Sequence, residues 1–177
     1  MNDLAPGSAY GVVTEPMTLQ IQRLLPGPIE RVWDYLTRSD LRRQWLAAGE
    51  MEMQVGAAFE LVWRNDELSD PPGRRPDGFG EEHRLECRIT DLDPPRRLAF
   101  TWGSSDGVTF ELEPVGSRVR LTVTHRRLPD RSTLLMVSAG WHAHLDALVA
   151  RLSGTVPASF WDGWSRLMKE YEQRIPG

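Results

Sequence analysis

The hydrophobic pattern of the sequence changes its period once, near residue 130, and this change constrains the fold more than any other feature. Before it, apolar and polar residues alternate over short segments such as 83–89 and 119–125, which is typical of strands that bury one face. Turns such as Asp93-Pro94-Pro95 separate the segments, and closely spaced strands of this kind pair as an antiparallel meander. After Pro129 the apolar residues recur at helical spacing over 134–152. One curved sheet that covers one long helix would bury both apolar surfaces, so we expect an α+β fold.

The same patterns predict where the elements lie. Strands are expected over residues 17–24, 50–54, 57–63, 83–89, 98–102, 108–112 and 119–125, with the second and third joined as a hairpin at Val55-Gly56. A short helix follows Pro28, Ser39 or Asp40 caps a second one, and a terminal helix begins near Pro157. We expect a flexible lead-in over 1–16, one domain over 17–153, and over 154–177 a terminal helix that packs on the domain or on a partner.

Composition excludes several functional classes. The chain has 177 residues and a net charge of −4, which suits one domain and argues against an electrostatic nucleic-acid binder. A single cysteine, Cys87, excludes an internal disulfide and a cysteine-rich zinc site. No apolar run approaches the roughly 18 residues of a membrane span, and the first residues show no secretory signal. We therefore expect a cytoplasmic protein with no cofactor, no membrane partner and no nucleic-acid partner.

Three segments, in combination with this order of elements, resemble a known family. They are residues 37–46 (TRSDLRRQWL), residues 93–102 (DPPRRLAFTW) and Gly140-Trp141 in the long helix. The chain resembles the SRPBCC (START/birch-pollen-allergen-like) superfamily over about residues 17–152. Within it, the chain is similar to bacterial proteins related to the C-terminal domain of the activator of heat-shock protein 90 ATPase. The resemblance implies a helix-grip fold, in which a seven-stranded curved antiparallel sheet wraps around the long C-terminal helix and encloses a cavity, and it suggests a role in the stress response.

Strand alternation predicts which residues surround that cavity. In a meander, the end of one strand lies level with the start of the next. Trp63, His83, Trp102, Val108 and His125 are therefore expected at one rim and on inward registers. The Pro- and Gly-rich segment 64–81 is long enough to be functional, and it should lie at the same rim as the start of the long helix.

From this placement we expect a pocket with apolar walls and a few polar anchors, which suits an aromatic or amphipathic ligand. The aromatic walls would be Trp63, Trp102 and Trp141. The apolar lining would be Phe59, Leu85, Phe100, Phe110 and Leu145, and the polar anchors His83, His125 and His144. Each of these side chains also fits a packed core without any ligand, which is the interpretation we prefer for Trp33 and Trp45 on the short helices.

His142-Ala143-His144 has the composition of a metal motif but not its spacing. Residues i and i+2 of a helix point roughly 200° apart, so the two rings cannot share an ion. We expect His142 to pair with Asp146 at the surface instead, and we expect no metal site. Cys87 is predicted to be a buried, inert thiol.

Three functions fit the sequence. The first is binding of a small hydrophobic or aromatic molecule without catalysis. The second is a cyclase, dehydratase or hydrolase in the same pocket, which requires two polar residues that converge on one point. The third is a chaperone-associated interaction module, which requires an exposed apolar patch on Phe160, Trp161 and Trp164. That same helix could instead pack on its own domain or form a homodimer.

Overall fold

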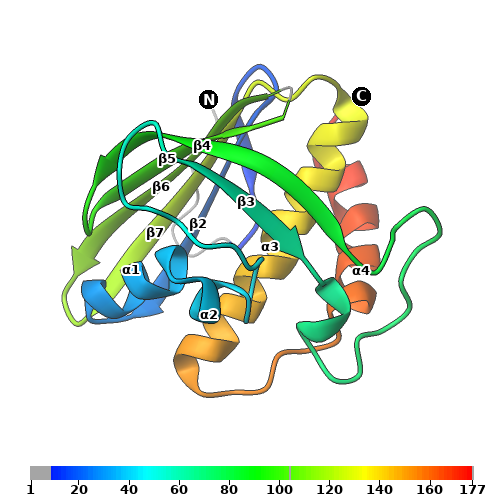
Figure 1. Ribbon diagram of the computed structural model, residues 1–177. Helices are drawn as coiled ribbons and strands as arrows, with labels where there is room; N and C mark the ends of the chain where they lie inside the picture. The colour runs from blue at the N-terminus through cyan, green and yellow to red at the C-terminus, as the bar shows by residue number, and fades with distance from the viewer. Residues whose placement is uncertain (1–8, 104, 177) are drawn as a thin grey trace.

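Seven antiparallel strands form one curved sheet in the computed structural model, which describes residues 9–103 and 105–176 (Figure 1). The order across the sheet is β1-β2-β7-β6-β5-β4-β3, so all strands after β3 follow one another as a meander. The strands are β1 (Val12–Glu15), β2 (Thr18–Pro26), β3 (Ala58–Trp63), β4 (His83–Asp93), β5 (Arg97–Trp102), β6 (Ser105–Val115) and β7 (Arg118–Arg126).

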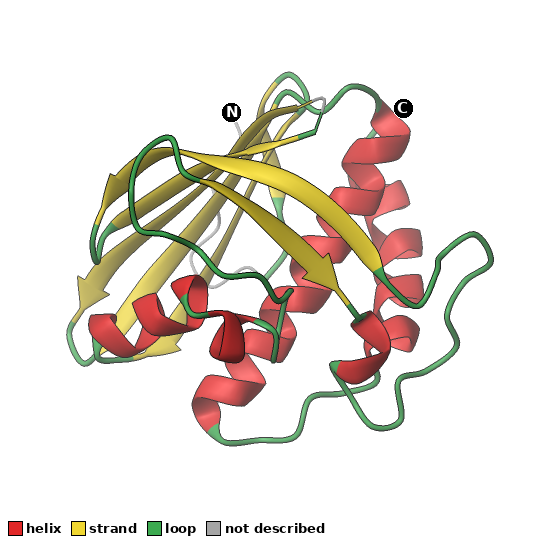
Figure 2. Ribbon diagram, viewed as in Figure 1, coloured by secondary structure: helices red, strands yellow, loops and turns green. Residues whose placement is uncertain are grey.

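Helices cover the inner face of this sheet (Figure 2). The short helices α1 (Ile29–Thr37) and α2 (Ser39–Arg42) follow β2, and the long helix α3 (Arg131–Ser153) and the terminal helix α4 (Phe160–Arg174) follow β7. The side chain of Asp130 caps α3 by accepting a hydrogen bond from the amide of Thr133 at 2.7 Å. Gly154 ends the helix with a φ of 72°, a conformation that glycine adopts without steric cost.

Alternating side chains of the central strands pack against α3 and form the core. Ile21 of β2, Phe110 of β6 and Val123 of β7 are fully buried, as are Leu145 and Leu148 on the facing side of α3. Each fully buried side chain of this kind contributes about 1.5–3 kcal/mol of transfer free energy. The helix-grip fold that the family resemblance implies is therefore the fold observed, with the long helix held against the concave face.

Two predicted segments differ from the structure. Residues 50–54 do not form a strand or a hairpin with β3; only an isolated bridge between Ala48 and Val62 joins this region to β3. At Gly49 the backbone passes so close to the carbonyl of Glu60 that no side chain fits there, and after it the chain turns away from the sheet. Residues 50–54 instead form a loop in which Met51 packs against the core and the other four residues are exposed.

The seventh strand of the sheet is β1, which lies at the edge opposite β3. Within the predicted lead-in 1–16, residues 12–15 form β1, which pairs with β2. In residues 12–15 two valines precede threonine and glutamate, so the segment has no apolar–polar alternation to indicate a strand. Residues 1–8, the rest of the predicted lead-in, lie outside the described part of the chain.

Helix α4 packs on α3 and on the 3-10 turn η1 (Asn65–Glu67), so the terminal segment folds back onto its own domain. Phe160 and Trp161 are buried, with only 5% and 2% of their surface exposed, and the expected apolar patch is therefore not a free surface. None of the helices in the described part of the chain is both long and apolar enough to cross a membrane.

Candidate functional site

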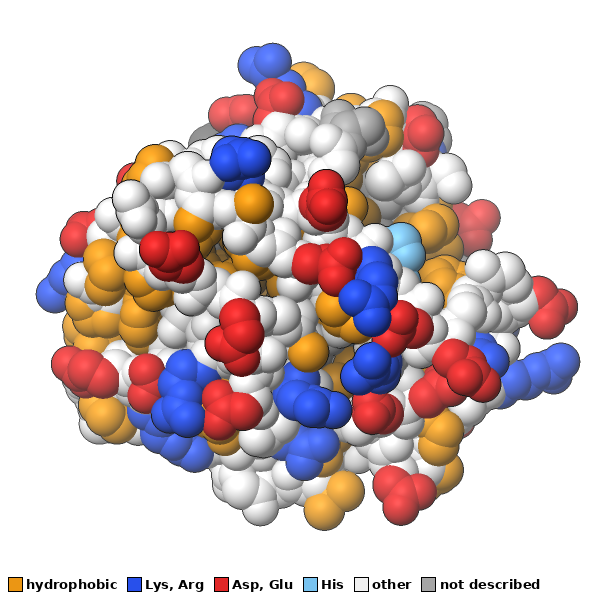
Figure 3. Space-filling model, in the orientation of Figure 1, with side chains coloured by type: hydrophobic (Ala, Val, Ile, Leu, Met, Phe, Trp, Pro, Cys, Tyr) orange, Lys and Arg blue, Asp and Glu red, His pale blue; other side chains and the backbone are white. Residues whose placement is uncertain are grey.

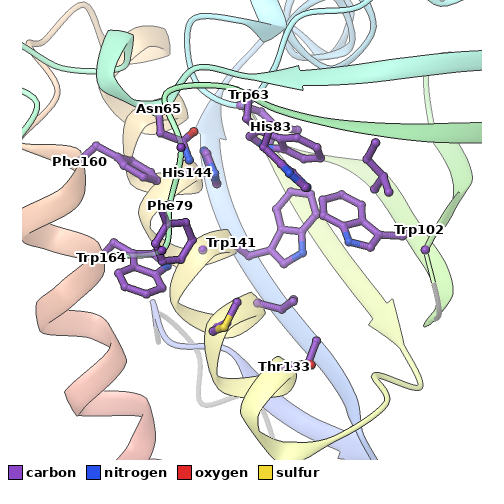
Figure 4. A pocket seen from close by; sticks show the side chains of 18 of the residues that line it. Trp63, Asn65, Phe79, His83, Trp102, Thr133, Trp141, His144, Phe160 and Trp164 are labelled. Carbon is purple, nitrogen blue, oxygen red and sulfur yellow. The ribbon is translucent and has the colours of Figure 1, made fainter. Parts of the chain in front are cut away.

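A cavity of about 530 Å³ lies where the sheet, α3, α4 and the segment 64–82 meet (Figure 4). Its walls come from the facing ends of β3, β4 and β5, from the first half of α3, and from the start of α4. Its aromatic lining consists of Trp63, Phe79, Trp102, Trp141, Phe160, Trp161 and Trp164, and its polar lining includes Asn65, Glu81, Glu82, His83, Ser105, Thr133 and His144. The size falls within the range of small-molecule sites in proteins.

Tryptophan rings build the wall on the sheet side. Trp102 lies 5.3 Å from Trp63 and 5.6 Å from Trp141, measured between ring centroids. Trp63 also lies 5.5 Å from the ring of His83, its partner across the β3–β4 pair. These are offset and edge-on arrangements, which aromatic rings prefer. These contacts show that the end of β3, the start of β4 and the end of β5 lie at one rim of the sheet, as the strand registers predict.

A second aromatic group closes the opposite side. Phe79, in the long segment, lies 5.2 Å from Trp161 and 5.1 Å from Trp164, both on α4. The indole N–H of Trp161 donates to a carboxylate oxygen of Asp66 at 2.7 Å, which ties α4 to the turn after β3. The segment 64–82 and α4 therefore form one aromatic cover over the cavity.

His125 supports the tryptophan wall from behind and does not line the cavity. It is fully buried, its Nδ1 accepts a hydrogen bond from the indole of Trp141 at 3.1 Å, and its Nε2 lies 2.9 Å from the hydroxyl of Ser105. Since Nδ1 is the acceptor, we assign the ring proton to Nε2, which then donates to Ser105. Burial lowers the pKa of His125 to about 3, so the ring is neutral at pH 7. The predicted anchor is a positioning residue for Trp141.

His144 reaches the cavity from α3. Its Nδ1 lies 2.8 Å from the carbonyl of Trp45, which accepts only, so Nδ1 carries the proton and donates it. Burial lowers the pKa of His144 to about 4, so the ring is neutral at pH 7 and its Nε2 is a hydrogen-bond acceptor. The ring packs against Phe160, with centroids 4.8 Å apart.

Asn65 is a second polar residue of the same lining. Its Oδ1 is buried and has no hydrogen-bond partner among the described residues. Since no solvent reaches this oxygen, it is not itself part of the cavity surface. Figure 4 shows Asn65 and His144 at the end of the cavity bordered by Phe160.

Charges at the mouth are paired with one another. Glu82 accepts hydrogen bonds from Arg64 at 2.7 Å and from Arg84 at 2.9 Å, and these bonds hold the pKa of its carboxyl below the usual value. Acidic and basic side chains are interspersed over the face shown in Figure 3. None of the described residues that line the cavity is lysine or arginine.

Six of the eleven predicted site residues line the cavity, and five do not. The six are Trp63, His83, Leu85, Trp102, Trp141 and His144. Phe59, Phe100, Phe110, His125 and Leu145 face inward as predicted but lie in the packed core, each at most 6% exposed. The interior of the sheet is filled with side chains along most of its length, because close packing leaves few voids, and the cavity is confined to one end.

The cover residues were not predicted from the sequence. Phe79 is the only aromatic residue in the segment 64–81, where it lies between Gly78 and Gly80, and this was the one available signal for it. Asn65 carried no signal at all. Trp161 and Trp164 were assigned to the terminal helix, but nothing in its pattern indicated that this helix borders a cavity.

The remaining predictions concern the two histidines of α3 and the cysteine. No group of three histidine, cysteine, aspartate or glutamate side chains with the geometry of a metal site occurs among residues 9–103 and 105–176. His142 and His144 diverge as predicted: His142 is buried against Tyr171 and lies 3.6 Å from Asp146, whereas His144 faces Trp45. The expected surface location of His142 is wrong, because Tyr10 and Tyr171 cover it. Burial raises the pKa of Cys87 to about 12, so its thiol is not a nucleophile at pH 7.

Comparisons with known proteins agree with this architecture. The model of a family described as "Activator of Hsp90 ATPase homolog 1-like protein" matches residues 26–153. A solution structure of the protein encoded by gene BPP1335 of Bordetella parapertussis is 38% identical, with a TM-score of 0.78 over 95% of this chain and 91% of that one. CalU16 from Micromonospora echinospora shares the fold at 18% identity, with a TM-score of 0.66 over 90% of this chain and 89% of that one. A protein of unknown function, EF2215 from Enterococcus faecalis, does so at 18% identity, with a TM-score of 0.66 over 91% and 86%. No curated protein sequence matches the chain.

Proposed function

Because the chain belongs to the family of Activator of Hsp90 ATPase homolog 1-like proteins, and because its helix-grip fold holds an aromatic-walled cavity, we propose that it binds a small aromatic molecule there. The observation that carries the proposal is the lining itself. Seven aromatic rings from the sheet, both long helices and the 64–82 segment converge on a space of about 530 Å³. Large apolar rings that border empty space lose packing contacts, which a flat ligand would restore.

The polar groups of the cavity favour binding over acid–base catalysis. A general base works best with a pKa near the operating pH, whereas burial lowers the pKa of His144 to about 4. His125, another candidate base, is covered by Trp102 and Trp141 and donates its remaining proton to Ser105. His83, the third candidate, is an exposed residue of the lining beside Trp63. These histidines are suited to orienting a ligand and the tryptophan wall.

A glycine in α3 offers a direct test of the cavity. Gly140 lines the cavity, and a Cβ added there would meet no atom within 4 Å. Gly140→Leu therefore fills the space with a side chain and raises helix propensity by up to about 1 kcal/mol, so the variant is expected to fold. Gly163 in α4 has equally open surroundings but lies outside the lining, and Gly163→Leu is the matched control.

The readout is the fluorescence of N-phenylnaphthylamine, an uncharged aromatic dye that brightens in apolar sites. We expect saturable binding to the natural protein, binding at least about tenfold weaker to Gly140→Leu, equivalent to about 1.4 kcal/mol, and unchanged binding to Gly163→Leu. Equal affinities for all three proteins, or no saturable binding to any, would contradict the proposal.

A further inference from the structure

The first half of the segment 64–82 is fastened to α4 by hydrogen bonds. The backbone amide of Trp161 donates to the carbonyl of Pro72 at 3.0 Å, and the amide of Arg74 donates to a carboxylate oxygen of Asp162 at 3.2 Å. The first of these bonds also satisfies one of the amides at the start of α4 that have no partner within the helix. This half of the segment is therefore fixed to the helix.

The last residue of the segment is fixed as well. Glu82 accepts hydrogen bonds from Arg64 at 2.7 Å and 3.0 Å, which join the two ends of the segment. They lie next to the pairing of Trp63 with His83 in β3 and β4, so the segment ends at the edge of the sheet.

Residues 76–81, which we call the flap, lie between these two fixed parts. Among the described residues, no hydrogen bond or ion pair joins the flap to another part of the chain, and the amide of Phe79 donates within it to the carbonyl of Pro76 at 3.3 Å. Residues 77–81 are exposed, yet residues 78–81 line the cavity. One wall of the cavity is thus a stretch of chain with few contacts to hold it in place.

Phe79 is the one large apolar side chain in the flap, and it rests on α4 (Figure 4). Its ring lies 5.2 Å from that of Trp161 and 5.1 Å from that of Trp164. Trp161 is held firmly, since it is 2% exposed and its indole donates to Asp66, whereas Phe79 is 36% exposed. If this aromatic contact breaks, the flap moves and α4 stays in place.

Glycines on both sides of Phe79 allow the flap to change its backbone conformation. Gly78 has a φ of 94°, which side chains other than glycine rarely adopt, and a Cβ added there would meet no atom within 4 Å. Gly80 likewise has no side chain to restrict rotation. Short loops that absorb such changes open and close over binding sites in microseconds to milliseconds.

Resting on the proposed function, we propose that residues 76–81 are the entrance of the cavity, through which the aromatic ligand passes when Phe79 lifts from Trp161 and Trp164. The return of Phe79 closes the cavity over the ligand. The docked part before Pro76 and the bonded Glu82 act as the two hinges of this movement.

The rate at which a reagent enters the cavity tests this proposal. Leu46 lines the cavity and is 2% exposed, so Leu46→Cys places a thiol where monobromobimane, an uncharged bicyclic reagent, arrives only after entering. Cys87 is a buried core residue outside the lining, so the natural protein gives the background rate.

In the Leu46→Cys background, Phe79→Ala and Gly78→Ala should each speed labelling at least about tenfold. The first removes the ring that holds the flap on α4, and the second strains the closed backbone at Gly78 but relaxes in the open one. Met136→Ala shortens another exposed lining side chain, on α3, and Gly56→Ala alters a glycine with a φ of 90° and equally open surroundings outside the lining. These two controls should keep the rate within about twofold.

Equal labelling rates in all five proteins would overturn the proposal. A rate in Met136→Ala as high as in Phe79→Ala, or in Gly56→Ala as high as in Gly78→Ala, would overturn it as well. Labelling is covalent and needs no equilibrium affinity, so it separates the flap from the proposed function. The expected pattern of rates in a protein that binds no N-phenylnaphthylamine would support the flap as the entrance and contradict aromatic binding.

Discussion

Arg42 is the buried charge on which the region between the short helices and β3 depends. Its side chain is fully buried, forms no ion pair with a carboxylate of the described residues, and donates hydrogen bonds to the carbonyls of Leu36, Thr37, Ala47 and Gly49. Burial lowers its pKa to about 10, so it remains charged at pH 7. Backbone carbonyls thus replace the water that the guanidinium loses on folding.

Arg42→Leu should therefore lower the free energy of unfolding by about 3 kcal/mol, because it leaves these carbonyls buried and unpaired. Arg43, the next residue, is half exposed and faces Glu67 at 3.8 Å. Arg43→Leu is the control, and its effect should be within about 0.5 kcal/mol. Equal effects of the two substitutions in urea denaturation would show that Arg42 does not have this role.

Three buried histidines make stability depend on pH. Burial lowers the pKa of His125 to about 3 and those of His142 and His144 to about 4, from 6.5 in the unfolded chain. Below pH 6.5 the unfolded state therefore binds protons that the folded state does not, and stability falls as the pH falls. From about one pH unit above 6.5 both states are neutral at these positions, so their contribution is constant.

We expect the free energy of unfolding to decrease by about 3–5 kcal/mol between pH 6.5 and pH 5, the sum over three histidines. Denaturation curves at several pH values measure this, and the NMR signals of the three rings should remain those of neutral imidazole at pH 6. Identical stability at pH 7 and pH 5 would contradict the assignment of these rings as buried and neutral.

At the scale of elements, Tyr171 joins three segments that are far apart in the sequence. Its hydroxyl accepts a hydrogen bond from the amide of Gly11 at 2.7 Å and lies 2.9 Å from Nδ1 of His142. It thereby connects α4 to the residue before β1 and to α3. Burial raises the pKa of this hydroxyl to about 12, so it stays protonated.

Tyr171→Phe should cost about 1–3 kcal/mol of stability, because the Gly11 amide and the His142 ring each lose a buried partner. It should also speed hydrogen exchange at the Gly11 amide. Tyr35→Phe is the control, since the Tyr35 hydroxyl makes no hydrogen bond with the described residues, and it should change stability by less than about 0.5 kcal/mol. An unchanged exchange rate at Gly11 in Tyr171→Phe would contradict this connection.

Sequence periodicity predicted the elements that have a strong pattern and failed at those that have a weak one. The strand over 119–125 and the helix over 134–152 carry long, consistent repeats, and both lie within observed elements, β7 and α3. The strand over 12–15 does not alternate between apolar and polar residues, and 50–54 alternates but forms a loop. Local pattern cannot tell these two apart, since strand pairing depends on partners far along the chain.

At the scale of the whole molecule, the candidate site could be predicted only in part for a similar reason. Strand registers placed Trp63, His83 and Trp102 correctly at one rim, because register is a local property of the meander. The packing of all side chains together decides which parts of the interior are filled and which are empty. Phe59 and Phe110 lie in the filled part, so they belong to the core and not to the cavity lining. The position of α4 and Phe79 over the cavity depends on tertiary contacts that no local pattern encodes.

The seven tryptophans fall into two groups, one that lines the cavity and one that packs in the core. Trp63, Trp102, Trp141, Trp161 and Trp164 line the cavity, whereas Trp33 and Trp45 lie in the core and are not lining residues. Two-dimensional NMR of the indole N–H groups reports on all seven in one experiment. Upon addition of N-phenylnaphthylamine, we predict that the five lining signals shift and that those of Trp33 and Trp45 stay in place. Unchanged signals throughout, or shifts of Trp33 and Trp45 as large as the others, would contradict an aromatic-binding cavity at this end of the fold.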